Sequence, residues 1–139
     1  MNNSGLKDLL FKMADDALII GHRNSEWTGI GPMLEEDMAF SSMAQDKIGH
    51  AIALYNILHE VLGEADPDTL GFKREAKQFK CCQFVELPIG EYDFSLIRHF
   101  LFLLLCYFLP IEVLSNIRPV ARSSLPKTVD SHRSSPTLP

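Results

Sequence analysis

The 139-residue sequence lacks several features that mark specialised classes of protein. Its three cysteines include no Cys-x-x-Cys spacing, which excludes the common zinc-site pattern, and the neighbours Cys81 and Cys82 are poorly placed to bridge each other. We therefore expect buried, reduced thiols and a cytoplasmic location. The net charge of -5 lacks the basic footprint of a nucleic-acid-binding protein, so no nucleic-acid partner is expected.

The sequence also lacks an apolar run long enough to cross a membrane, which takes about 20 residues. Its most apolar run, residues 100–109, is about half that length and directly follows Arg98 and His99. We interpret this run as a buried helix and expect no membrane association. Residues 1–12 contain no apolar core of a signal peptide.

No stretch alternates as a β-strand would, and helical periodicity dominates instead. The pattern predicts long helices from Leu6 to about Trp27 and from about Pro32 to Leu62, the second ending at Gly63. Shorter helices are expected over residues 72–84, with Arg74 on the solvent side, and from an Asp93 cap through Phe94, Ile97, Leu101 and Leu104. The buried side expected of the second helix is Leu34, Met38, Ser41, Ile48, Ala51, Tyr55, Leu58 and Leu62. An adjacent stripe, which is also expected to face inward, consists of Met43, Lys47, His50 and Leu54. The fold class is therefore all-α.

The character of the sequence changes after Leu114. Residues 1–114 carry 9 basic and 17 acidic side chains, whereas residues 115–139 are basic and hold six serines and four prolines but no aromatic residue. Such a segment cannot bury enough apolar surface to offset the entropy lost on ordering. We predict that residues 115–139 are a disordered tail.

The most informative motif is Gln45-Asp46-Lys47-Ile48-Gly49-His50, which lies about twenty residues after Ser25-Glu26-Trp27. Helical di-iron carboxylate proteins combine a Glu on one helix with a Glu-x-x-His pair on another. Here Glu26 and His50 fit that pattern, but Lys47 replaces the second carboxylate, and a protonated ammonium group cannot bind iron. Taken singly, His50 also fits a hydrogen-bonded core residue or a surface partner of Asp46, and Glu26 a polar helix end.

Several motifs together resemble the phenylacetic acid catabolic protein family, the ferritin-like subunits of phenylacetyl-CoA epoxidase. The resemblance covers residues 6–102. Gly21-His22-Arg23-Asn24-Ser25-Glu26-Trp27 and Phe84-Val85-Glu86-Leu87-Pro88-Ile89-Gly90 are more similar to the structural subunit than to the catalytic one. The fold that the resemblance implies is the N-terminal part of a ferritin-like helical bundle.

The resemblance implies a degenerate metal site at Glu26, Lys47 and His50, with His22 and Asp46 as supporting polar residues. Lys47 would replace the metal as a built-in cation and pair with inward carboxylates such as Glu26. The chain would hold no metal and no catalytic residue. It would be a subunit of an oxygenase complex that is not catalytic by itself. Iron would reside in a catalytic paralogue, NADPH would act through a separate reductase, and phenylacetyl-CoA would be bound only indirectly.

The resemblance fades after Phe102, and nothing similar to the family follows Asn116. Residues 1–114 are therefore expected to form the N-terminal half of a ferritin-like domain. For residues 115–139 we favour a frame-shifted or decayed gene end over a genuine short variant of the family. Two alternatives stay open. One is an independent di-iron oxygenase with iron held by Glu26, His50 and Asp46. The other is a non-functional fragment of the structural subunit.

Overall fold

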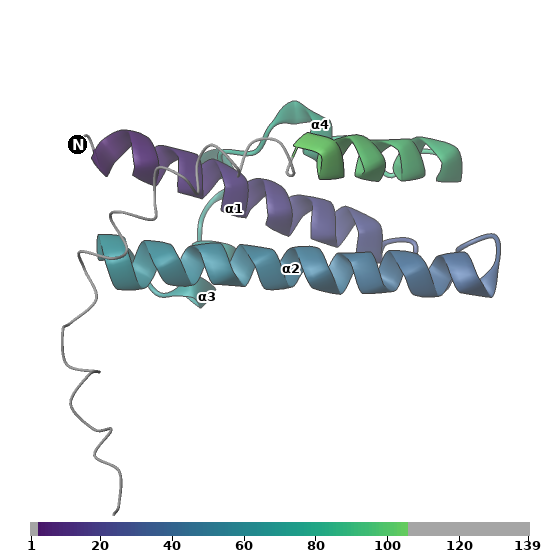
Figure 1. Cartoon of the computed structure of the whole chain (residues 1–139), viewed down its shortest axis with the longest axis horizontal. Coiled ribbons are helices and arrows are strands. Elements are labelled where there is room, and N and C mark those ends of the chain that lie inside the picture. Colours follow the sequence, from purple (N-terminus) through teal and green to yellow (C-terminus); the bar gives the residue numbers. More distant parts are fainter. Residues whose placement is uncertain (1–2, 106–139) are drawn as a thin grey trace, which may run out of the picture. The chain divides into compact units, whose positions relative to one another are not determined.

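The computed structural model describes residues 3–105. Two long helices, α1 (Asn3–Ser25) and α2 (Leu34–Leu62), lie side by side as an antiparallel hairpin (Figure 1). No strand occurs within the described range, and the predicted all-α class is confirmed. The predictions for Cys106 and for the tail lie outside the described residues.

The core of the hairpin combines the inner faces of α1 and α2. The helices approach each other closely at Gly21, where an added Cβ would lie 2.9 Å from Cγ1 of Ile48. Leu34 and Met38, expected in the core, are 70% and 64% exposed because the first turns of α2 extend past the end of α1 (Figure 1). The buried residues of α2 are Phe40, Ala44, Lys47, Ala51, Tyr55 and Leu58, and the buried apolar residues of α1 are Leu10, Phe11, Ala14, Ala17, Leu18 and Ile20.

Glycines with positive φ shape both ends of α2. Gly29, at φ 85°, lies in the connection from α1, and its N–H donates to Oδ1 of Asp37 at 2.7 Å. Gly63, at φ 69°, ends the helix as predicted. Its N–H donates to the carbonyl of His59, and the next N–H, of Glu64, donates to that of Leu58. This pattern satisfies carbonyls that the end of a helix leaves without intrahelical partners.

The helix predicted over residues 72–84 is wrong. The structure has α3 (Pro67–Phe72), a short 3-10 helix, η1 (Ala76–Gln78), and α4 (Gln83–Glu86). Carboxylates of α1 explain part of the difference, because they accept the backbone N–H groups of Lys80 and Cys82 at 2.8 and 2.7 Å. A backbone donor that is used in this way is not available to a local helix.

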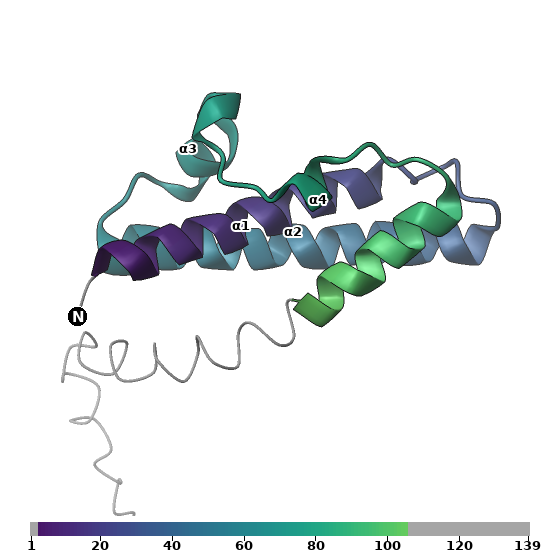
Figure 2. The ribbon, with the colours of Figure 1, turned by 90° about the horizontal axis from the view of Figure 1, so that it is seen from above.

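The last described element is a helix over residues 92–105, which crosses the hairpin near the connection between α1 and α2 (Figure 2). It begins one residue before Asp93, so Asp93 is not its cap. Its orientation also differs from the expectation of a buried apolar run. Ser95, Arg98, His99 and Phe102 are buried, whereas every other residue from 94 to 105 is exposed. The tilted and edge-to-face contacts among Trp27, Phe40 and Tyr92 connect the start of this helix to the hairpin.

Two expectations from composition can be compared with residues 3–105. Within that range no helix has the length and apolar character needed to span a membrane. Cys81 and Cys82 are both free thiols, but Cys81 is only half-buried and Cys82 is exposed, so the expectation of buried thiols is wrong for Cys82.

Candidate functional site

Lys47 lies in the middle of α2 and is only 5% exposed. Its Nζ is 5.2 Å from the centre of the Phe102 ring, which places the ammonium group in cation–π range of the helix over residues 92–105. No carboxylate among residues 3–105 forms an ion pair with Lys47. Lys47 is thus an inward-facing cation on the buried side of α2, as its place in the sequence predicted.

His99 and Asn24 form a buried polar contact close to this lysine. Nδ2 of Asn24 and Nδ1 of His99 are 2.7 Å apart, and both residues are almost fully inaccessible to solvent. Burial, reinforced by the positive charges of Lys47 and Arg98, lowers the pKa of His99 to about 4. The imidazole is therefore neutral at pH 7, and its Nδ1 accepts a hydrogen bond from the amide. Sequence periodicity did not single out either residue.

Glu26 does not pair with Lys47. Its Oε1 accepts a hydrogen bond from Nη1 of Arg23 at 2.7 Å, on the surface just beyond the end of α1. Arg23 also donates to the carbonyl of Glu86 at 3.0 Å. The expected Lys47–Glu26 ion pair is therefore replaced by a local pair between residues three positions apart, which share one side of a helical turn.

The other predicted site residues do not converge on Lys47. His50 is exposed, so the inward position predicted for it together with Lys47 is wrong, and Asp46 and His22 are exposed as well. Within residues 3–105, no three His, Cys, Asp or Glu side chains are grouped as a metal ion would need. The donors present here do not fit iron, because the Glu26 carboxylate is held by Arg23 at the surface and the buried position is a lysine.

A second buried cation, Arg98, was missed by sequence reasoning. Its Nη1 donates to the carbonyls of Leu87 and Pro88, at 2.6 and 3.0 Å, and so fixes the connection that precedes the helix over residues 92–105. Nε and Nη2 of Arg98 are buried without a partner in the described part of the chain, as is Nε1 of Trp27. Burial lowers the pKa of Arg98, and the charge of Arg23 adds to this effect.

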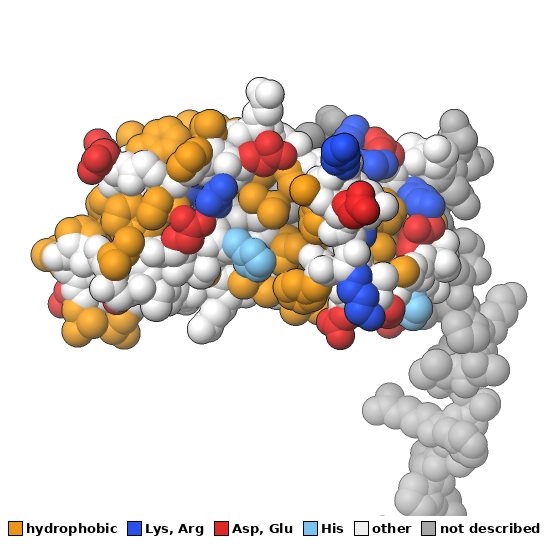
Figure 3. Space-filling model, turned by 180° about the vertical axis from the view of Figure 1, so that it is seen from behind, with side chains coloured by type: hydrophobic (Ala, Val, Ile, Leu, Met, Phe, Trp, Pro, Cys, Tyr) orange, Lys and Arg blue, Asp and Glu red, His pale blue; other side chains and the backbone are white. Residues whose placement is uncertain are grey.

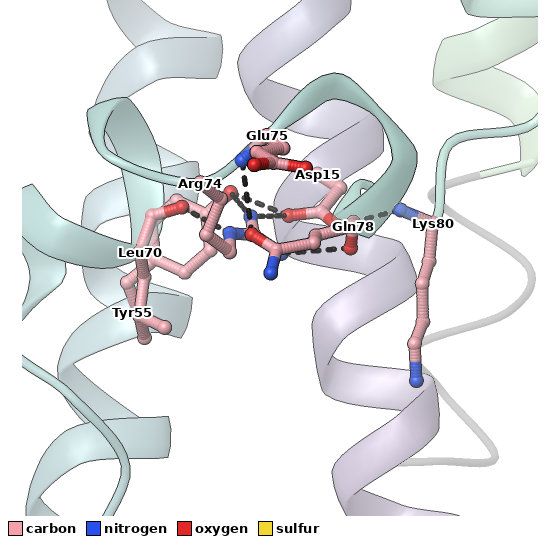
Figure 4. Close-up of polar contacts among 7 residues, drawn as sticks. All are labelled: Asp15, Tyr55, Leu70, Arg74, Glu75, Gln78 and Lys80. Carbon is pink, nitrogen blue, oxygen red and sulfur yellow. Dashed lines mark hydrogen bonds and ion pairs between the residues drawn. The ribbon is translucent and has the colours of Figure 1, made fainter.

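The most extensive polar cluster lies around Asp15 on α1 (Figure 4) and includes none of the predicted site residues. Asp15 is fully buried and pairs with the guanidinium of Arg74, whose Nη1 is 3.2 Å from Oδ2. The carboxylate also accepts the hydroxyl of Tyr55 at 2.6 Å and the N–H of Lys80 at 2.8 Å. The prediction that Arg74 faces solvent is therefore wrong. A signal was available, because Asp15 interrupts an apolar helical stripe.

The Asp15 cluster connects α1, α2 and the segment after α3, which is a structural role. Burial, followed by the hydrogen bond to Asp15, raises the pKa of Tyr55 far above its ordinary value. Burial and the nearby Asp15 charge raise the pKa of the Cys81 thiol to about 12, so this thiol is not poised as a nucleophile. The arrangement supports packing of the hairpin and offers no activated group.

The fold and the site define an all-α, ferritin-like bundle protein whose candidate metal position on the second helix is a lysine. Comparison with known proteins adds the family. The model of the phenylacetic acid catabolic protein family matches residues 1–116, and the chain belongs to this family. The resemblance predicted from the motifs is thus confirmed.

One curated relative is a subunit of 1,2-phenylacetyl-CoA epoxidase from Escherichia coli (strain K12). It is 34% identical to this chain over 89 residues, which cover 64% of this chain and 36% of the relative. The matched region therefore spans little more than a third of the length of that relative.

Proposed function

We propose that this chain acts as a structural subunit of a phenylacetyl-CoA epoxidase and supports a di-iron catalytic paralogue. Family membership and the similarity to an epoxidase subunit support a role in phenylacetate catabolism. The proposal adds that the chain itself performs no redox chemistry. It contributes instead a helical surface on which the catalytic paralogue packs and which helps to shape the phenylacetyl-CoA site.

The observation that carries the proposal is the burial of Lys47. Lys47 is 5% exposed on the inner side of α2. Its place three residues before His50 supports its assignment to the position where the di-iron pattern requires a carboxylate. The ammonium group repels a metal cation at that position, and its charge helps to keep the buried His99 neutral. The remaining carboxylate of the motif, Glu26, is paired at the surface with Arg23.

The cofactors therefore belong to the partners. Iron in the catalytic paralogue would supply oxygen activation, and electrons would come from NADPH through a separate reductase. The residues of this chain hold the helices in place. Arg98 and Arg23 do so by donating to the carbonyls of residues 86–88, and Asn24 does so through His99.

Co-expression of the tagged 139-residue chain with the catalytic paralogue from the same source tests the proposal. We expect the paralogue to co-purify, the complex to contain iron, and the chain alone to contain far less than one iron per molecule. Lys47→Glu is the matched variant for the measurement of iron content. It restores a carboxylate at the buried position and leaves the exposed motif residues unchanged.

Each alternative has its own outcome in this experiment. Stoichiometric iron and oxygen consumption by the chain alone would support an independent oxygenase. A chain that neither captures the paralogue nor unfolds cooperatively would support the non-functional fragment. Capture of the paralogue by an iron-free chain is the result that the structural role requires.

A further inference from the structure

The helix over residues 92–105 carries its polar side chains on its buried side. Each exposed side chain from residue 94 to residue 105 is Leu, Ile or Phe, and Figure 3 shows hydrophobic side chains gathered over this helix, at the upper left of that view. Ser95, Arg98 and His99 are instead 0%, 1% and 3% exposed. A group that binds these polar side chains is therefore enclosed by the protein.

One edge of the buried Arg98 guanidinium has no acceptor among residues 3–105. Nη1 donates to the carbonyls of Leu87 and Pro88, which fixes the orientation of the guanidinium. Nε and Nη2 are buried and have no partner in that range. Their N–H groups point the same way from one edge of the planar group, and this fork matches the two oxygens of a carboxylate. Donors of a charged group that stay unbound in the interior are costly, so an acceptor is expected at this edge.

The end of α1 brings a third buried donor to the same stretch of this helix. Asn24 contacts His99 at 2.7 Å, and Trp27 contacts Tyr92 with 5.5 Å between the ring centroids. The chain from Asn24 to Trp27 therefore runs along the helix from His99 toward Tyr92, and Arg98 lies within that stretch. Nε1 of Trp27 is buried without a partner among the described residues. Three buried side-chain donors thus lack acceptors within residues 3–105, against one buried acceptor, Oδ1 of Asn24, that lacks a donor.

Charge distinguishes an anion from a water molecule as the acceptor. Lys47 is 5% exposed, and its Nζ lies over the ring of Phe102, one helical turn beyond Arg98. Among residues 3–105, no carboxylate forms an ion pair with Lys47 or Arg98. The carboxylate of Glu26 is paired with Arg23 at the surface. A water molecule would complete the hydrogen bonds of Arg98 but leave both buried charges unbalanced, whereas an anion supplies acceptors and the opposite charge together.

We propose that the chain binds a small carboxylate anion, of the size of formate or acetate, whose two oxygens accept from Nε and Nη2 of Arg98. Nε1 of Trp27 is the third donor, and the ammonium group of Lys47 adds attraction through its charge. The anion is small because each of the three donor atoms is enclosed and has almost no contact with solvent. This site goes beyond the structural role proposed above, since it requires neither the catalytic paralogue nor phenylacetyl-CoA.

The single tryptophan of the sequence is the probe, because its indole N–H gives one resonance in the NMR spectrum of an isotopically labelled chain. The 139-residue chain, dialysed into chloride buffer, is titrated with sodium acetate and, at equal ionic strength, with sodium chloride. We expect the indole resonance to move to saturation with acetate and not with chloride. Arg98→Lys keeps the charge but loses the two-donor edge, and should raise the dissociation constant for acetate at least about 10-fold. The matched control, Arg23→Lys at the surface, should leave this constant unchanged.

Two measurements on the wild-type chain cover the case in which Arg98→Lys does not fold. The thermal midpoint should rise with acetate concentration more than with chloride concentration, because acetate binds the folded chain. Native mass spectrometry of the chain as purified detects any carboxylate that dialysis leaves bound. A wild-type chain that shows neither a retained carboxylate nor a response to acetate beyond that to chloride would overturn the proposal. Equal weakening of acetate binding by Arg98→Lys and Arg23→Lys would also overturn it.

Discussion

The ammonium group of Lys47 lies 5.2 Å from the centre of the Phe102 ring, so a buried cation of α2 faces an aromatic side chain of the helix over residues 92–105. This contact links the two parts of the chain that sequence reasoning treated separately, the degenerate metal motif and the apolar run. An ammonium group that is removed from water loses its free energy of hydration. A cation–π contact with a single aromatic ring offsets only part of this loss.

Replacement of Lys47 by methionine should therefore stabilise the protein. Methionine has a similar length, needs no hydration and packs well against an aromatic ring. We expect Lys47→Met to raise the free energy of unfolding by about 1 kcal/mol, the lower end of the gain seen when buried charges are replaced by apolar groups. Urea denaturation measures the change.

Lys47→Ala separates the charge from the volume of the side chain. It also removes the charge, but it leaves a cavity and should lower the free energy of unfolding by about 2 kcal/mol. A methionine variant as unstable as the alanine variant would contradict the prediction, and would show that the charge has a stabilising partner.

The Asp15–Arg74 pair should be the most sensitive polar contact of the described fold. Asp15→Asn keeps the shape of the side chain but removes the charge that faces the guanidinium of Arg74. Breaking a buried ion pair from one side costs about 3 kcal/mol or more. Asp8→Asn is the control, since Asp8 forms two ion pairs, with Lys12 and Lys80, at the exposed surface. Urea midpoints should fall markedly for the first variant and hardly for the second, and equal falls would contradict the prediction.

The sequence was sufficient to predict the two helices of the hairpin, but it was not sufficient to predict the segments that pack on them. Long helices with apolar periodicity form from local propensity and their own buried faces, so α1, α2 and the stop at Gly63 could be predicted. The prediction of a helix over residues 72–84 was wrong because Asp15 binds Arg74 and the N–H of Lys80. Asp15 lies 59 residues before Arg74 in the sequence, and a local pattern does not reveal a contact at that separation.

The candidate site shows the same limit. Lys47 could be placed on a buried face from its spacing along α2, because the helical period fixes which residues share a side. The partner of His99 could not be predicted, because it depends on where the helix over residues 92–105 meets the hairpin. Glu26 was assigned to Lys47, although Arg23, only three residues away, was within reach of its carboxylate. In that helix the apolar stripe predicted the helix itself but not its facing, since polar contacts of Arg98 and His99 determine the rotation.

Acidification should destabilise the protein through His99. Its pKa is about 4 in the folded state and 6.5 as the ordinary value, so below pH 6.5 the unfolded chain binds a proton that the folded chain does not. The stability that the neutral His99 contributes is therefore fully present above pH 6.5, and it is lost progressively as the pH drops toward 4. We expect this group to remove about 2 kcal/mol by pH 5.

Unfolding free energies of the wild type and of His99→Gln, measured between pH 7 and pH 5, isolate this effect. The variant should lose the part of the pH dependence that His99 causes. Lys47→Met should reduce that part, because the charge of Lys47 helps to lower the pKa of His99. An unchanged pH dependence in the glutamine variant would show that His99 is not its source.

Two glycines of the hairpin should respond in opposite directions to alanine. A Cβ at Gly21 would lie 2.9 Å from Cγ1 of Ile48 and 3.3 Å from the carbonyl oxygen of Ala44, so α1 and α2 would have to separate at their close approach. A Cβ at Gly49, in the middle of α2, would meet nothing within 4 Å. Gly49→Ala should therefore raise the free energy of unfolding by about 1 kcal/mol, the difference in helix propensity.

Gly21→Ala should lower the free energy of unfolding by about 1–3 kcal/mol, because overpacking outweighs the same gain in propensity. Thermal or urea unfolding of both variants against the wild type gives the comparison, and each variant serves as the control of the other. If both alanine variants stabilised the protein, α1 and α2 would be able to separate at Gly21 at little cost in free energy. The buried lysine on the partner helix would then also have room to move.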